Sequence, residues 1–409
     1  MRRNAVTCVL AWFALGTIAI AGQQGRPDAG WVAAWTAGPQ QQVGALKPLA
    51  NRTVRAHIAL SVGGSRLRVR FSNEYGTKPL MIGGATVGLT GPDGAIRPGT
   101  LRKMTFGGAA SILIPIGAPA YSDPIDLQIP AGAATAAVSL YLPGEVMPET
   151  YHRQVAAQDN PAGPRAAAEI SEEGDFTGQS TIAGATPSPY LFLTRVDVLD
   201  PRAAGVVVVM GTTRTAGTGH WPEFLAQRLN AGGRPMSVVN ASLVANPLTR
   251  PYPGGGDAGL ARFDRDVLTQ PGITHVVIAD AINDIGQPGG PVIPASEMPT
   301  VESLSAAYLQ LAARARARGV KAIVTTLMPF EGVPFPNFYS PEKEKLRVAL
   351  NQWIRGSRAF DGLIDLDAIM RDPDNPARFR PELHTANNFA PNEKGERMIS
   401  DAIDMKLFR

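Results

Sequence analysis

Four short polar segments in the second half of the chain carry the side chains best suited to chemistry. They are 211–217 (GTTRTAG), 240–246 (NASLVAN), 281–286 (AINDIG) and 387–395 (NNFAPNEKG). Together they supply hydroxyls and side-chain amides. A hydroxyl attacks a carbonyl carbon only after a base has taken its proton, and an N–H group can stabilise the negative oxygen that forms. Acyl transfer through these segments would therefore require a base close by.

Each of the first three segments follows a short apolar run that is typical of a parallel strand buried on both faces. Those three runs are 206–210, 236–240 and 274–280, and two further runs of the same kind follow at 321–327 and 362–366. Helix-like stretches at 301–318, 341–357 and 392–407 lie between or after them. This alternation predicts a doubly wound α/β domain over residues 200–409, built on a five-stranded parallel sheet. In such sheets the loops at the carboxyl ends of the strands hold the reactive groups.

The first half of the chain has a different pattern, with short alternating runs separated by Gly- and Pro-rich turns. The candidate strands are 53–61, 66–72, 80–89, 111–114, 125–129 and 137–142. Strands of this length and spacing predict an antiparallel β-sandwich domain over residues 30–145. Residues 146–188 are rich in Pro, Gly, Ala and acidic residues and have weak periodicity. We therefore predict that residues 146–199 connect the two domains.

The N-terminus has the pattern of an export signal. Arg2 and Arg3 precede an apolar run that ends in Ala19-Ile20-Ala21, a small-x-small cleavage pattern, so we expect a signal peptide over residues 1–21. A retained anchor is the alternative. The only cysteine, Cys8, lies inside this segment, and we expect a secreted or periplasmic protein with no membrane segment after cleavage. The 39 Lys and Arg residues nearly balance the 35 Asp and Glu residues, which gives no electrostatic argument for nucleic acid as a partner.

In order and spacing the four segments resemble those of the GDSL, or SGNH, hydrolase superfamily, in particular its large secreted members with an N-terminal β-sandwich. Flanking stretches agree, among them SVGG and RVRFSN early in the chain and RFDRD at 262–266. The resemblance implies a flavodoxin-like fold and an esterase ancestry, with substrates that are acyl esters of carbohydrates, lipids or small alcohols. In the family, a Gly-Asp-Ser turn presents the nucleophile. A glycine N–H and an asparagine side chain complete the oxyanion hole, and an Asp-x-x-His segment supplies carboxylate and base.

Most of the positions that the family uses for catalysis hold other residues here. Thr213 stands at the nucleophile, and Ser242 at the oxyanion glycine, while Asn283 keeps the amide of the oxyanion hole. Asn387 stands at the catalytic aspartate and Ala390 at the histidine. The remaining replacements are Thr212 for aspartate and Ala281 for glycine. Because alanine carries no proton and the members of a triad act as a unit, these positions together indicate a degenerate active site.

This degeneracy predicts a non-catalytic protein that binds a small-molecule or carbohydrate ester ligand. The alternative is an active or weakly active ester hydrolase that uses Thr213 or a water molecule as nucleophile and Asn283 as oxyanion donor. That alternative requires a base other than the residue at position 390. The candidates are His220, seven residues after Thr213, and His384, six residues before Ala390.

Metal or nucleotide chemistry has little support in the sequence. No His-x-x-x-His pair, cysteine pair or carboxylate cluster has the spacing of metal ligands. Asp280 and Asp284 lie four residues apart, but the resemblance implies a structural role for Asp284. Residues 254–256 (GGG) follow no predicted strand and favour a turn over a phosphate-binding loop. We therefore expect neither a metal nor a cofactor.

Overall fold

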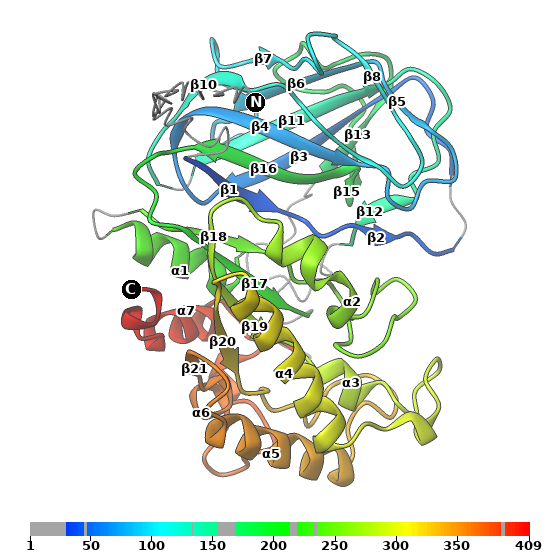
Figure 1. Ribbon diagram of the computed structural model, residues 1–409. Helices are drawn as coiled ribbons and strands as arrows, with labels where there is room; N and C mark the ends of the chain where they lie inside the picture. The colour runs from blue at the N-terminus through cyan, green and yellow to red at the C-terminus, as the bar shows by residue number, and fades with distance from the viewer. Residues whose placement is uncertain are drawn as a thin grey trace, which may run out of the picture.

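Figure 1 shows the computed structural model, which describes residues 30–44, 47–132, 134–153, 168–212, 219–231, 235–385 and 389–409. One half of the molecule is a β-rich region, and the other half is an α/β region built on a parallel sheet. The expected signal peptide, residues 1–21, lies outside the described residues.

The α/β region contains a five-stranded sheet in which all neighbouring strands are parallel. Its strands are β17 (Val206–Gly211), β18 (Ser237–Asn240), β19 (Ile273–Ala279), β20 (Lys321–Thr325) and β21 (Gly362–Ile364). Their spatial order is β18-β17-β19-β20-β21. This is the flavodoxin-like order, in which ligands bind beyond the carboxyl ends of the strands on either side of the first strand. The predicted fold class is confirmed.

Helices cover both faces of this sheet. They are α1 (Trp221–Asn230), α2 (Gly259–Phe263), α3 (Ile282–Gly286), α4 (Val301–Ala317), α5 (Pro341–Gly356), α6 (Leu366–Met370) and α7 (Glu393–Ala402). Val208 of β17 belongs to the same buried cluster as Tyr308 of α4. Its neighbour Val209 belongs to a second cluster, with Trp221 of α1 and Ile399 of α7. Successive side chains of one strand thus face opposite layers, which is why the apolar run is continuous rather than alternating.

The β-rich region is a sandwich of two antiparallel sheets. One sheet has the order β1-β16-β4-β10, with β9 also paired to β4, and the other has the order β14-β13-β3-β11-β6-β7. The strands of the first half of the chain are β1 (Trp31–Thr36), β2 (Gln40–Gln41), β3 (Arg52–Leu60), β4 (Gly64–Ser72), β5 (Leu80–Ile82), β6 (Gly84–Leu89), β7 (Arg102–Lys103), β8 (Ile112–Ile114), β9 (Pro119–Tyr121), β10 (Ile125–Ile129) and β11 (Ala134–Leu142). Val54 of β3 and Val69 of β4, which lie in different sheets, share one buried cluster.

The described part of residues 146–199, which we predicted to connect the two domains, contains several strands, three of which belong to these two sheets. It forms β12 (Thr150–His152), β13 (Ala168–Glu173), β14 (Thr186–Ser188), β15 (Tyr190–Leu191) and β16 (Leu193–Leu199). β13 pairs with β3, and β16 lies between β1 and β4. The sequence does not indicate β16 as a buried strand, because it contains the charged residues Arg195 and Asp197. Both are buried, and Arg195 Nε lies 2.9 Å from Asp197 Oδ1.

The sandwich and the α/β region share buried surface. One apolar cluster runs from Ala33 of β1 and Phe71 of β4 to Val208 and Phe263 in the α/β region. Polar contacts cross the same boundary, including a hydrogen bond of 2.5 Å from the Tyr75 hydroxyl to Asp257 Oδ2. The division into two domains stays a proposal, and the cluster of buried side chains is continuous across it.

Candidate functional site

The carboxyl ends of β17, β18 and β19 bring the described residues of the first three polar segments together, as the fold requires. Thr212 directly follows β17, and its hydroxyl accepts a hydrogen bond from Asn283 Nδ2 on α3. The same Nδ2 donates to the carbonyl oxygen of Asn246 at 3.0 Å. Thr212 and Asn283 are both buried, each with 3% of its surface exposed. Residues that are far apart in the sequence therefore meet at one edge of the sheet.

The two hydrogen-bond donors that we predicted for an oxyanion hole, the Asn283 amide and the Ser242 N–H, already have partners within the protein. Asn283 has two N–H bonds on Nδ2, and Thr212 and Asn246 accept both. The backbone N–H of Ser242 donates to Asn240 Oδ1 at 3.1 Å. An oxyanion at this edge would have to displace these contacts. Such displacement removes the advantage of donors that are aimed in advance at the charge that develops.

Ala390, which the sequence resemblance aligns with the family's histidine, contributes a packed methyl group. Ala390 is fully buried, and its carbonyl oxygen accepts hydrogen bonds from the backbone N–H of Thr385 at 2.8 Å and from its hydroxyl at 3.2 Å. Asn392 caps the N-terminus of α7 by accepting from the N–H of Gly395 at 3.0 Å. Position 390 itself therefore carries no ionisable group. Thr213 and Asn387 lie outside the described residues.

A buried arginine, Arg262, ties these loops together. Its Nε donates to Asn246 Oδ1 at 2.8 Å, and its Nη1 donates to the carbonyl oxygen of Ala241 at 2.7 Å. Its Nη2 donates to the carbonyl oxygen of Gly211 at 3.4 Å. Arg262 lies in the RFDRD stretch that resembles the family, but sequence reasoning assigned it no role. The fan of guanidinium donors explains why a fully buried charge is tolerated here.

Asp284 also has a structural role. Its Oδ2 accepts from the N–H of Leu248 at 2.6 Å, and its Oδ1 accepts from the N–H of Thr249 at 2.9 Å and from its hydroxyl at 2.5 Å. Burial raises the pKa of Asp284, and these hydrogen bonds oppose the rise. Asp284 therefore fixes the loop that follows Asn246, and both of its oxygens accept hydrogen bonds within the protein.

Asp280, at the end of β19, has an unusual environment. Its side chain is fully buried, Oδ1 accepts from the N–H of Ala281 at 2.8 Å, and Oδ2 has no hydrogen-bond partner among the described residues. The nearest cation, Nη2 of Arg262, lies 4.0 Å from Oδ2, which is too far for a hydrogen bond. Burial raises the pKa of Asp280 to about 7; Arg262 opposes this rise and Asp284 adds to it.

The loop after β19 begins with a strained backbone conformation. Ala281 adopts a left-handed conformation with φ of 84°, which glycine adopts freely and alanine adopts at a cost of about 1–2 kcal/mol. The sequence resemblance implies a glycine at this position, and the observed φ is one that favours glycine.

The sequence of this region matches a known family. Residues 204–398 match the GDSL-like Lipase/Acylhydrolase family. This part of the chain is a GDSL-like lipase/acylhydrolase domain. Its range covers the parallel sheet and all of the loops described above.

Solved structures of GDSL-like proteins and esterases are similar to about half of the chain. A lipolytic protein of the G-D-S-L family from Desulfitobacterium hafniense is 20% identical, with 48% of this chain and 97% of that chain covered and a TM-score of 0.35. An aryl esterase from M. smegmatis is 15% identical, with 49% and 96% covered and a TM-score of 0.39. A carbohydrate acetylesterase from Sinorhizobium meliloti is 14% identical, with 50% and 98% covered and a TM-score of 0.39. No curated protein matches the chain.

The two histidines proposed as substitute bases of the GDSL-like domain lie in different surroundings. His220 is fully buried at the start of α1, and its Nδ1 lies 2.7 Å from Oε1 of Glu396 on α7. Its Nε2 has no hydrogen-bond partner among the described residues. His384 is partly exposed, and its Nδ1 lies 2.6 Å from the carbonyl oxygen of Thr385. Only His220 is therefore held by a carboxylate.

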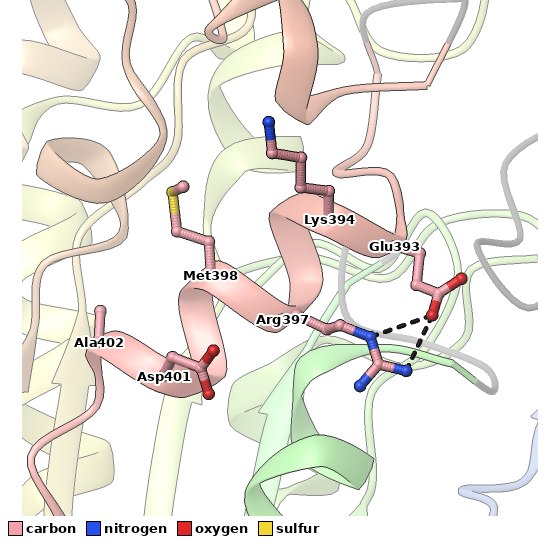
Figure 2. Close-up of a pocket in the computed structure, with 6 residues that line it drawn as sticks. All are labelled: Glu393, Lys394, Arg397, Met398, Asp401 and Ala402. Carbon is pink, nitrogen blue, oxygen red and sulfur yellow. Dashed lines mark hydrogen bonds and ion pairs between the residues drawn. The ribbon is translucent and has the colours of Figure 1, made fainter.

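The outward face of α7 carries a shallow depression that is separate from the strand ends. It is lined by Glu393, Lys394, Arg397, Met398, Asp401 and Ala402, which all project from this one helix (Figure 2). Arg397 donates to Glu393 at 2.8 Å and stacks on Phe224, with 4.2 Å between its Cζ and the ring centroid. This is a solvated helix face rather than a built site.

Within the described ranges, no group of three His, Cys, Asp or Glu side chains is placed to hold a metal ion. Across the same ranges, none of the helices combines the length and the apolar character needed to cross a membrane.

Proposed function

We propose that this protein is an exported, non-catalytic member of the GDSL-like fold that binds a small-molecule or carbohydrate ester ligand. The ligand binds at the carboxyl ends of β17, β18 and β19, around Thr212, Ser242 and Asn283, which we call the strand-end site. The observation that carries the proposal is the state of the oxyanion donors. Both N–H bonds of Asn283 Nδ2 and the N–H of Ser242 are used inside the protein. Ala390 supports it, because a buried methyl group stands where the family has its base.

The size of these effects argues for binding without turnover. Loss of a triad member costs on the order of a million-fold in turnover in a serine protease, and loss of one oxyanion donor costs roughly a hundred- to a thousand-fold. Loss of the base and loss of the oxyanion donors both slow the acyl-transfer step, and the second loss lowers the rate that remains after the first. A ligand can still be held, because binding requires neither proton transfer nor charge stabilisation.

We expect the purified protein to hydrolyse p-nitrophenyl acetate at the background rate, and Thr213→Ala to leave that rate unchanged. The measurement is release of p-nitrophenol, with circular dichroism to verify that both proteins are folded. A rate well above background that disappears in Thr213→Ala would overturn the proposal. Thr300→Ala, which removes the hydroxyl that caps the distant helix α4, is the matched control for loss of a threonine hydroxyl.

A second candidate, a weakly active ester hydrolase, is favoured by one specific contact. The buried pair of His220 and Glu396 has the carboxylate-to-Nδ1 arrangement that orients a catalytic imidazole. If this pair serves as base, hydrolysis survives in Thr213→Ala and falls in His220→Ala. His384→Ala is the matched control, because the pair does not include this histidine.

A further inference from the structure

The hydrogen-bonding character of the strand-end site is inverted relative to an esterase. An esterase offers N–H donors to the carbonyl oxygen of its substrate. Here the Asn283 and Ser242 donors have internal partners, and the buried group left without a hydrogen bond among the described residues of these loops is an acceptor, Asp280 Oδ2. A buried carboxylate oxygen without a donor is costly, typically by more than a neutral polar group, so a donor that reaches Asp280 would be bound favourably.

The structure has room for one such group. A cavity of ≈ 20 Å³ lies at the carboxyl ends of β17, β19 and β20, and its lining includes Thr212, Asp280, Thr325 and Thr326. This volume holds about one water-sized group. These polar residues follow or end three strands, and the rest of the lining is apolar: Ala279, Ile282, Leu327, Met328 and Leu366. The cavity lies at the edge of the sheet where doubly wound proteins bind their ligands.

We propose that this cavity binds a single hydroxyl group of a carbohydrate or alcohol, with Asp280 Oδ2 as the acceptor. This proposal rests on the proposed binding function and specifies that a hydroxyl of the ligand, rather than its ester group, enters the cavity. A hydroxyl donates to the carboxylate, whereas an ester presents only acceptor oxygens, which the carboxylate repels. A neutral hydroxyl also leaves the balance between Asp280 and the nearby Arg262 intact.

The groups around Asp280 set how the preference depends on pH. Arg262 of α2 faces its Oδ2, Asp284 of α3 raises its pKa, and Asp266 lies 3.4 Å from Arg262 Nη1. The hydroxyl of Tyr308 on α4 donates to the backbone carbonyl oxygen of Asp280 at 2.7 Å, not to its carboxylate. Above a pH of about 7 the carboxylate is ionised and accepts only, and below it the acid can donate. The preference for a hydroxyl is therefore strongest in mild alkali.

The test compares methanol, which donates, with dimethyl ether, which only accepts. Each is titrated at pH 8 into ¹⁵N-labelled protein, and the amide resonance of Ala281, whose N–H donates to Asp280 Oδ1, reports binding. We expect a saturable shift with methanol and at least roughly tenfold weaker binding of dimethyl ether, since hydrogen bonds to charged acceptors are the stronger ones. Equal responses to the two probes, or no response to methanol, would overturn the proposal.

The variant Asp280→Asn tests whether the preference for methanol depends on the hydrogen-bonding character of the side chain at position 280 rather than on the size of the probe. Asparagine keeps the shape and offers its N–H bonds where Oδ2 was, so dimethyl ether should bind and the ratio of affinities should fall by roughly tenfold or more. Asp401→Asn, on the exposed face of α7, is the matched control and should leave the ratio unchanged. Neither probe is an ester. A Thr213-dependent esterase rate would thus refute the proposed function without affecting this measurement, and a failed titration beside a background esterase rate would refute the hydroxyl site alone.

Discussion

Asp280 is a carboxyl group whose charge is costly in the folded protein. Its burial raises its pKa from the ordinary value of 3.8 to about 7. Between these two values the folded protein holds a proton that the unfolded chain has already lost. Folding is therefore favoured by this group below pH 4, and that contribution is lost as the pH rises through 7.

Asp280→Asn should therefore stabilise the protein in mild alkali relative to acid. The free energy of unfolding of the variant, minus that of the unmodified protein, should rise by up to about 4 kcal/mol between pH 4 and pH 8, since each pKa unit corresponds to about 1.4 kcal/mol. Urea denaturation at several pH values measures this difference. A difference that is flat over this range would contradict the assignment, and Asp401→Asn, which is exposed, should be flat.

Single residues also mark the limit of prediction from the sequence. The sequence led us to expect that Thr212 and Asn283 lie at one edge of a sheet, because apolar runs precede both. It could not reveal that the Thr212 hydroxyl accepts a hydrogen bond from the amide of Asn283, because that contact depends on rotamers across 71 positions of chain. Asn283 therefore looked like a surviving catalytic residue when its donors already had partners.

Helices α1 and α7 meet through one buried polar junction. Glu396 of α7 accepts from the backbone N–H of Trp221 at 2.7 Å and lies 2.7 Å from Nδ1 of His220. One carboxylate thus caps the N-terminus of α1, where the helix dipole favours negative charge, and holds the imidazole in place. The junction joins α1, the first helix after β17, to α7, the helix that begins within the 387–395 segment.

Removal of this carboxylate should be strongly destabilising. We expect Glu396→Ala to lower the free energy of unfolding by about 3–5 kcal/mol, because it leaves a buried imidazole and a backbone N–H without their partner. Glu396→Gln should cost less, since the amide oxygen can still accept one hydrogen bond. Urea denaturation provides the measurement. Glu393→Ala, on the exposed side of the same helix, should change stability by no more than about 0.5 kcal/mol.

Strands were predictable to different degrees for a physical reason. The five parallel strands are buried on both faces, so their composition alone indicates them. β13 and β16 are stabilised by pairing with β3, β1 and β4, which are distant in the sequence, and they carry charged side chains. For such strands, amino-acid composition predicts the flanking turns more reliably than the strands themselves. Composition alone therefore does not indicate the strands within residues 146–199.

The molecule as a whole has a core that does not stop at the boundary between its two regions. The cluster that contains Ala33 and Phe71 of the sandwich also contains Val208 and Phe263 of the α/β region. Hydrogen bonds reinforce this contact, including that from Asn230 Nδ2 to the carbonyl oxygen of Ser61 at 2.8 Å. Separation of the two regions would expose apolar surface on both.

We therefore expect one unfolding transition for the whole protein. Scanning calorimetry should give a van't Hoff enthalpy close to the calorimetric enthalpy, as for a single cooperative unit. Two resolved peaks, or a fragment of residues 200–409 that folds alone with the same midpoint, would contradict a shared core. Such a result would support two independent domains in its place.

The place of β16 in its sheet also has a consequence for how the chain acquires its structure during synthesis. β1 begins at Trp31, and its partner β16 ends at Leu199, opposite Trp31 in the register. The ribosome must therefore release roughly 170 residues before the first strand can find its neighbour. Until then β1 and β4 have unpaired edges, which are prone to pair with other chains. A nascent chain stalled before residue 193 should consequently need a chaperone to stay soluble, whereas one released past residue 199 could close the sheet unaided.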